Sequence, residues 1–178
     1  MMTTFDDPDI PVYHNTSLLP QDYEIRLRTL NSHGCEDIKR DTVTVFPEVF
    51  ARFTPDRLAG CEPLLINFTN QSNIIPGTTF LWNFGDGKYS NKIQPDPHLY
   101  SNTNSASLYR NIYMSAMTQY GCFDDTTVQV EIYPYIYANF TIDRPSICSD
   151  EPFHINRINT RGGINHYYWD YENDGSTN

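Results

Sequence analysis

An internal repeat constrains this chain of 178 residues more than any other feature. Ten positions recur at a spacing of 87 residues, and the register holds without a gap from about Tyr13 to Cys61. The recurring pairs are Tyr13 and Tyr100, Gly34 and Gly121, Cys35 and Cys122, Asp37 and Asp124, Val43 and Val130, Val45 and Ile132, Pro47 and Pro134, Phe53 and Phe140, Cys61 and Cys148, and Trp82 and Trp169. Because periodicity of this kind fixes the number of units, it predicts a stretch of a longer tandem array. We expect the second half of one unit at residues 1–48, a whole unit at 49–134 and the first half of another at 135–178.

Alternation of apolar and polar residues predicts β-strands along most of the chain. Residues 23–29 alternate in the manner of a half-buried strand, and residues 42–46 and 126–132 are alternating and β-branched. Apolar residues alternate in one expected strand at 64–68 and in the next at 80–84. Strands of this length, separated by turn residues, indicate an all-β chain of antiparallel sandwiches. A unit of 87 residues suits the immunoglobulin-like sandwich, which has roughly 100 residues.

Two short links containing proline join the expected units. They lie at residues 46–50 and 133–137, and neither has the glycine and serine content of a flexible linker. Proline fixes one backbone dihedral and so stiffens such a link. The sequence therefore predicts neighbouring units that sit end to end in a rod.

Charge and composition exclude several classes of function. The net charge of −10 argues against nucleic acid or an anionic membrane as a partner, since both select basic patches. No stretch approaches the roughly 20 apolar residues of a membrane span, so we expect no membrane insertion in this segment. None of the five histidines has metal-ligand spacing with a cysteine or another histidine, and no serine has a nucleophile context. The sequence predicts a protein that is not an enzyme.

The most specific string is Trp-Asn-Phe-Gly-Asp-Gly at residues 82–87, followed by Ser90, Pro97, His98 and Tyr100. This pattern resembles the PKD (polycystic kidney disease) repeat, whose signature runs W-D-F-G-D-G, then S, then P-x-H-x-Y. The strand that follows in that family corresponds to residues 109–117. The Gly-Cys-x-Asp string that comes next looks like a turn common in bacterial surface members of the family. With the partial units included, the resemblance covers nearly the whole chain.

Two departures from the family pattern affect loops. Asn83 stands where the family has aspartate, and the third unit reads Asp-Tyr-Glu-Asn-Asp-Gly at residues 170–175, one residue longer before its Asp-Gly. We interpret the aromatic residues of the motif as core and its Gly-Asp-Gly as a tight turn, with ligand binding as the alternative. The predicted core residues are Phe53, Trp82, Phe84, Tyr100, Ile112 and Trp169.

A candidate metal site lies near the end of the sequence. Asp170, Glu172 and Asp174, followed by Gly175, have the spacing of the first half of a calcium loop, because carboxylates at alternate positions converge on one hard cation. The alternative is an acidic hairpin turn. Apart from this possible calcium, we expect no cofactor.

The cysteines indicate disulfides rather than a metal site, since each unit has two of them in an apparently secreted array. One follows the first strand (Cys61, Cys148), and the other lies at the last hairpin (Cys35, Cys122). In an immunoglobulin-like sandwich these positions are at opposite ends, about 20 Å apart for strands of six residues, whereas a disulfide requires Cα atoms within about 7 Å. We therefore expect disulfides that join neighbouring units, which we call staples. A disulfide within one unit remains an alternative if the first strand is short.

Triplets that can accept an N-linked sugar begin at four asparagines. Two of them lie in strand-like runs, and such triplets arise often by chance, so we expect low occupancy. The positions are Asn15, Asn67, Asn70 and Asn139.

The resemblance implies a structural role at the bacterial cell surface. The first hypothesis is a spacer segment of a long adhesin or filament, serving adhesion or gliding motility by presenting a distal tip. Its partners would be neighbouring units, with a surface polysaccharide or another surface protein as a further candidate. The alternative is a carbohydrate- or protein-binding accessory of an exported hydrolase, for which the available rings are Tyr89, Tyr133, Tyr135, Tyr137, Tyr167 and Tyr168. A third idea is that the partial units of different copies complement each other in a strand-swapped polymer.

Overall fold

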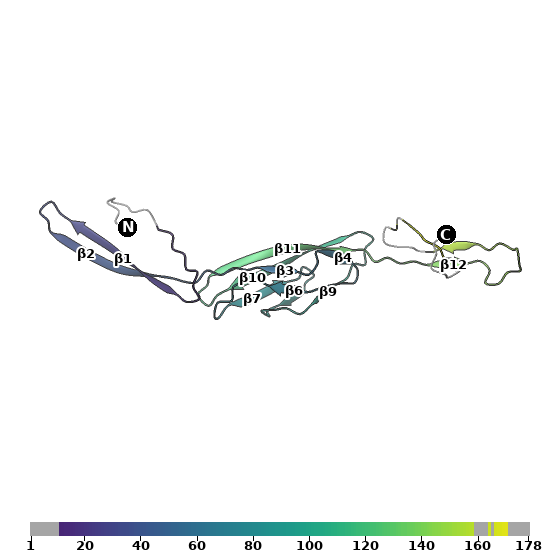
Figure 1. Ribbon diagram of the computed structural model, residues 1–178, viewed down its shortest axis with the longest axis horizontal. Helices are drawn as coiled ribbons and strands as arrows, with labels where there is room; N and C mark the ends of the chain where they lie inside the picture. Colours follow the sequence, from purple (N-terminus) through teal and green to yellow (C-terminus); the bar gives the residue numbers. More distant parts are fainter. Residues whose placement is uncertain (1–10, 159–163, 165, 171–178) are drawn as a thin grey trace.

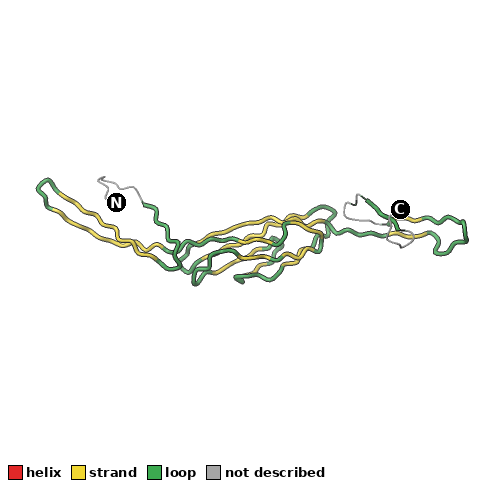
Figure 2. The backbone as a smooth tube through the Cα atoms, viewed as in Figure 1, coloured by secondary structure: helices red, strands yellow, loops and turns green. Residues whose placement is uncertain are grey.

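The computed structural model describes residues 11–158, 164 and 166–170, and this part of the chain contains strands but no helix. The molecule is elongated, with a hairpin at one end, a thicker central β region at residues 49–133 and a short strand pair at the other end (Figures 1 and 2). Among the described residues there is accordingly no helix that is able to cross a membrane.

The central β region contains several sheets that share one core. Five strands form the largest sheet, in the order β4 (Ala59–Cys61), β11 (Phe123–Tyr133), β10 (Leu108–Met117), β7 (Thr79–Asn83) and β8 (Tyr89–Ser90). Two antiparallel pairs accompany it: β3 (Phe53–Pro55) with β6 (Phe68–Asn70), and β5 (Leu64–Ile66) with β9 (His98–Tyr100). Only β4 and β11 pair in parallel among these ladders. The arrangement is all-β and compatible with a β-sandwich.

The hydrophobic core lies between these sheets. Trp82 of β7 and Ile112 of β10 are completely buried, and the rings of Phe53 and Phe68 pack against Trp82 with centroids 5.0 and 5.9 Å away. Of the residues that we predicted for the core, Phe53, Trp82, Phe84, Tyr100 and Ile112 are all buried. Trp169 is half-buried and meets the ring of Phe140 edge to face at 5.4 Å.

The elements on either side repeat parts of the central β region at the spacing of 87 residues. The hairpin of β1 (Gln21–Leu30) and β2 (Glu36–Val45) pairs Gln21 with Val45, as β10 and β11 pair Leu108 with Ile132. At the other end, β12 (Phe140–Ile142) pairs with β13 (Ile155–Arg157) in the register of β3 with β6. The structure thus repeats the pairing of strands at the same spacing at which the sequence repeats residue types.

One predicted strand is divided in the structure. We expected residues 64–68 to form a single strand, but β5 ends at Ile66 and β6 begins at Phe68. Asn67 separates them, and its backbone and side chain both hydrogen-bond to Asp56. The first half of the run pairs with β9 and the second half with β3, so the change of partner interrupts the ladder without changing the alternation of buried residues.

Candidate functional site: the junction before the central β region

The link at residues 46–50 joins β2 to the central β region through a set of hydrogen bonds. The amide of Glu48 donates to the carbonyl oxygen of Asn15 at 3.0 Å. The Asn73 side chain binds the link twice, since its Nδ2 donates to the Glu48 carbonyl at 2.8 Å and its Oδ1 accepts from the Phe50 amide at 2.6 Å. Pro47 is fully buried. The link is therefore held by both parts that it connects.

The tip of the β10–β11 hairpin completes this junction. The ring of Tyr120 stacks on Phe46, with centroids 4.6 Å apart and planes 7° from parallel. Asp124 accepts a hydrogen bond at Oδ2 from the Ala51 amide at 2.7 Å, just beyond the link. Gly121 has a φ of +84°, a left-handed conformation that glycine adopts without steric cost and that lets the tip close tightly. The Gly-Cys-x-Asp string thus forms a turn that contacts the preceding link.

Asn15 and Asn102 perform the same task 87 residues apart. Asn15 Nδ2 donates to the carbonyl oxygens of Leu19 and Val45, both at 2.8 Å. Asn102 Nδ2 donates to Ala106 and Ile132 at 2.9 and 2.8 Å. Each amide therefore ties a loop to the end of the last strand of its hairpin. Because Asn15 is 2% exposed and its nitrogen is engaged in both bonds, it is not available to a sugar in this fold.

An open hollow of about 410 Å³ lies beside the junction. It lies between the link and the start of β11, where the surfaces of these two segments do not pack closely. The lining residues are Phe46, Pro47, Glu48, Val49, Phe50, Cys122, Phe123 and Asp124.

The motif at residues 82–87 forms a buried aromatic strand end followed by a tight turn. Trp82 Nε1 donates to the Lys92 carbonyl at 3.0 Å, and the Tyr100 hydroxyl donates to the Phe84 carbonyl at 2.9 Å. Gly85 has a φ of +76°, and a Cβ at this position would lie 2.6 Å from the backbone oxygen of Asn111. The motif therefore fixes the edge of the large sheet against β10.

The carboxylate of Asp86 is fully engaged within this turn. Its Oδ2 binds His98 Nε2 at 2.8 Å, and its Oδ1 accepts from the Lys88 amide at 3.1 Å. Burial by itself raises the pKa of Asp86, but the bonds from His98 and Lys88 together hold that pKa below its ordinary value. Burial also raises the pKa of Tyr100. His98 is buried, and its ring stacks on that of Phe84 with centroids 4.1 Å apart. Asp86, His98 and Tyr100 therefore contribute to the packing of this part of the core.

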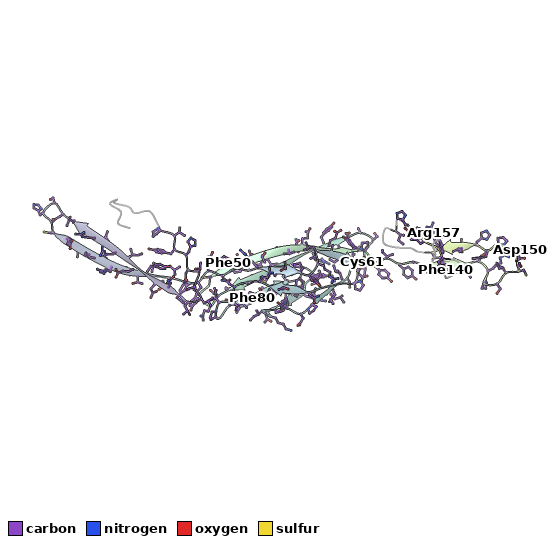
Figure 3. All side chains as sticks on the ribbon, viewed as in Figure 1. Phe50, Cys61, Phe80, Phe140, Asp150 and Arg157 are labelled. Atoms are coloured by element: carbon purple, nitrogen blue, oxygen red, sulfur yellow. The ribbon has the colours of Figure 1, made fainter. Side chains whose placement is uncertain are left out.

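The four cysteines occupy the ends of the elements. Cys61 pairs with Tyr133 at the far end of β11, whereas Cys122 directly precedes the start of β11 and lines the hollow at the junction. Figure 3 shows Cys61 at the end that faces β12, opposite the end where Phe50 lies. The 11 residues of β11 span about 33 Å at the rise of a β-strand, far beyond disulfide reach. All four cysteines are free thiols in the structure, and the staples between units stay a prediction.

The candidate calcium site falls mainly outside the described residues. Asp170 is exposed, but Glu172 and Asp174 belong to the part of the chain that the structure does not describe. Within the described ranges, no group of three or more histidine, cysteine, aspartate or glutamate side chains is arranged to hold a metal ion. The calcium prediction is therefore left open.

The tyrosines proposed as a stacking platform are exposed but belong to different elements. Tyr89 is in β8 at the edge of the large sheet, and Tyr133 ends β11. Tyr135 and Tyr137 stack on each other in the second link with centroids 6.3 Å apart. Tyr167 lies beneath the guanidinium of Arg157 at 4.2 Å. Tyr89 and Tyr133 are separated by β10 and β7 in the large sheet, and Tyr135, Tyr137 and Tyr167 lie outside that sheet.

Comparison with known proteins adds no family assignment, because the sequence matches no protein-family model and no curated protein.

Sequence reasoning missed the polar residues that hold the junction. Asn15 and Asn102 are identical at the repeat spacing, so the signal was present in the sequence. Asn73 and Asp124 act on backbone groups far along the chain, and only the fold brings them to the link.

Proposed function

We propose that this chain is a spacer segment of a long bacterial surface protein, built from tandem PKD-like units of the immunoglobulin-like sandwich type. The units would lie at residues 1–48, 49–134 and 135–178, the first and last being partial. Such a protein works mechanically at the cell surface, where it holds a distal adhesive or motility-related tip away from the cell. The role is not enzymatic, and the partners are neighbouring units of the same array and the surface that the tip meets.

The observation that carries this proposal is the clamped junction. A spacer transmits force and direction only if its joints resist bending, and a flexible link of a few residues would not do so. Here the link at residues 46–50 is hydrogen-bonded from both sides and stacked against the hairpin tip. Repetition of the asparagine ties at a spacing of 87 residues supports the view that one joint design serves the whole array.

The exposed tyrosines give the binding alternative less support. A carbohydrate platform needs several rings side by side on one face, whereas Tyr89 lies in the edge strand and Tyr135 and Tyr137 lie in a link. Their positions suit contacts at joints between units better than a flat stacking surface.

The length of engineered arrays tests the spacer role. One, two or three further copies of residues 49–135, which make up one repeat of 87, are inserted in register into the chain. The end-to-end length is then measured by electron microscopy. Because β11 spans about 33 Å and a link follows it, each insertion is expected to add about 40 Å.

A matched array in which Asn73 and Tyr120 are changed to alanine serves as the control, since these side chains hold the link from the side of the central β region. A linear increase for the native array and bending in the control support the spacer role. Growth with the square root of the number of units, equal in both arrays, contradicts it.

A further inference from the structure

The tip of the β10–β11 hairpin places the thiol of Cys122 beside the link at residues 46–50. Tyr120, which belongs to the same turn, stacks on Phe46 with ring centroids 4.6 Å apart. Thr118 holds Cys122 in this turn, because its Oγ1 accepts from the Cys122 amide at 3.1 Å and its amide donates to the Cys122 carbonyl at 2.9 Å. Cys122 and Phe46 also line the same hollow of about 410 Å³. The hairpin cysteine of the central β region therefore lies next to the link that precedes this region.

The far end of the central β region places Cys61 beside the link that follows. β4 runs parallel to β11, with Cys61 opposite Tyr133. The amide of Glu62 donates to the Tyr133 carbonyl oxygen at 3.3 Å and continues this pairing. Side chains of residues paired across adjacent strands point to the same face of a sheet. The thiol of Cys61, which is exposed, and the ring of Tyr133 therefore lie on one face.

Phe46 and Tyr133 are equivalent residues of the two links, 87 positions apart. Phe46 shows what a link residue meets in the unit after it, which is the hairpin tip with Cys122. Tyr133 shows what it meets in the unit before it, which is Cys61. In a joint between two whole units, both cysteines therefore lie beside one aromatic residue, on the face to which its ring points.

The separations at such a joint suit a disulfide. Strands that pair lie about 5 Å apart, so the first cysteine is that close to the link residue. The stacked rings bring the hairpin tip against the same residue, and the hollow beside Cys122 leaves room for a second side chain. Within one unit, by contrast, Cys61 and Cys122 lie at opposite ends of β11, which spans about 33 Å.

We propose that a disulfide crosses the joint between neighbouring units and connects the Cys61 position of one unit to the Cys122 position of the next. The proposal rests on the proposed array of tandem units and adds a covalent bond to its joint. Asn73 and Asp124 hold the link by hydrogen bonds, which can break and form again, whereas the disulfide is a permanent staple on one side.

The staple forms by thiol–disulfide exchange with a small disulfide such as oxidised glutathione. The two cysteine thiols lose their protons and an electron pair as the S–S bond forms between them. The small disulfide takes up that electron pair and those protons as its own S–S bond breaks, and it leaves as two thiols. An oxidising compartment outside the cytosol supplies such a disulfide.

An engineered array with one further copy of residues 49–135 inserted in register tests the proposal. In this array Tyr133 of the first copy stands before the second copy, as Phe46 stands before the first. The joint variant keeps only Cys61 of the first copy and Cys122 of the second, and every other cysteine is changed to serine. The matched control keeps only Cys61 and Cys122 of the second copy, so both proteins have the same composition.

Both arrays are incubated in a glutathione redox buffer, and the monomer is isolated by size-exclusion chromatography. Free thiols are then alkylated, and the protein is analysed by mass spectrometry before and after proteolysis. In the joint variant both thiols are expected to be lost from alkylation and a linked peptide to appear. In the control both thiols are expected to remain free. Thiols that stay free in the joint variant overturn the proposal, as does equal closure in both arrays.

The result is separate from the test of the spacer role. Under reducing conditions the array can lengthen as expected for a spacer while the joint variant fails to close, and this outcome overturns the staple alone. Closure in an array that does not lengthen linearly supports the staple and contradicts the spacer. Circular dichroism verifies the fold of both variants. If the joint variant does not fold, a second inserted copy allows the same pair to be placed at the next joint, where closure is again expected.

Discussion

Two glycines in the motif at residues 82–87 provide a direct measure of how tightly its turn packs. Gly85 and Gly87 have similar positive φ values of +76° and +88°. A Cβ at position 85 would lie 2.6 Å from the backbone oxygen of Asn111, whereas a Cβ at position 87 would meet no atom within 4 Å. Alanine at either position therefore has the same backbone strain, and only position 85 adds a steric clash.

The expected costs follow from these geometries. A left-handed conformation costs a residue with a Cβ roughly 1–2 kcal/mol, partly offset because alanine restricts the unfolded chain. We expect Gly87→Ala to lower the free energy of unfolding by about 1 kcal/mol. The clash at position 85 involves β10 backbone that cannot move aside, and overpacking of this kind costs about 1–3 kcal/mol more. Gly85→Ala is thus expected to cost about 3 kcal/mol.

Urea unfolding of both variants, followed by tryptophan fluorescence, gives the difference. Trp169 is replaced by phenylalanine in every protein so that the signal reports Trp82, which is fully buried. With a slope of about 1 kcal/mol per molar urea, the midpoint of Gly85→Ala should lie about 2 M below that of Gly87→Ala. Equal midpoints would refute the reasoning, because they would mean that the turn does not press against β10.

Three further predictions concern polar groups and thiols. Because the pKa of Asp86 is lowered in the folded protein, its contribution is present above about pH 4 and is lost as the pH falls through the folded pKa. Thermal melts should therefore show less acid destabilisation below pH 4 in Asp86→Asn than in the wild type. Asn102→Ala removes two buried hydrogen bonds and should lower the free energy of unfolding of the central β region by about 2 kcal/mol in urea titrations, whereas Asn15→Ala should leave that transition unchanged. After oxidation by diamide, peptide mapping of the monomer should find no Cys61–Cys122 disulfide, and finding one would contradict the separation along β11.

The sequence was sufficient to predict the longer strands, such as β1, β10 and β11, but not strands of two or three residues such as β3, β8 and β12. Alternation at residues 126–132 reflects one buried face, which is a local property that a sequence records directly. Residues 23–29 form the predicted strand, but the expected half-buried face is wrong for the structure, because Ile25 and Leu27 are exposed. The break at Asn67 was not predictable in this way, because alternation continues across it while the pairing partner changes.

The contacts at the junction could not be predicted from the sequence, because they join residues that only the fold brings together. Asn73 and Asp124 bind backbone amides 23 and 73 residues away, and neither spacing leaves a pattern in the sequence. Asn15 and Asn102 recur at a spacing of 87 residues, as Asp37 and Asp124 do, so this signal was visible in the sequence although its meaning was not. The interpretation of Asp86 as a turn residue agrees with its hydrogen bonds, which engage both carboxylate oxygens.

The central claim is that the junction before the central β region is rigid, and the distance between Cys35 and Cys61 tests it most directly. Cys35 is at the tip of the β1–β2 hairpin and Cys61 is at the far end of the central β region, so two strand lengths separate them, on the order of 60 Å. With Cys122 and Cys148 changed to serine, single-molecule energy transfer between dyes on the two thiols should give one narrow distribution, which Asn73→Ala broadens. A wild-type distribution as broad as that of the variant would contradict the account.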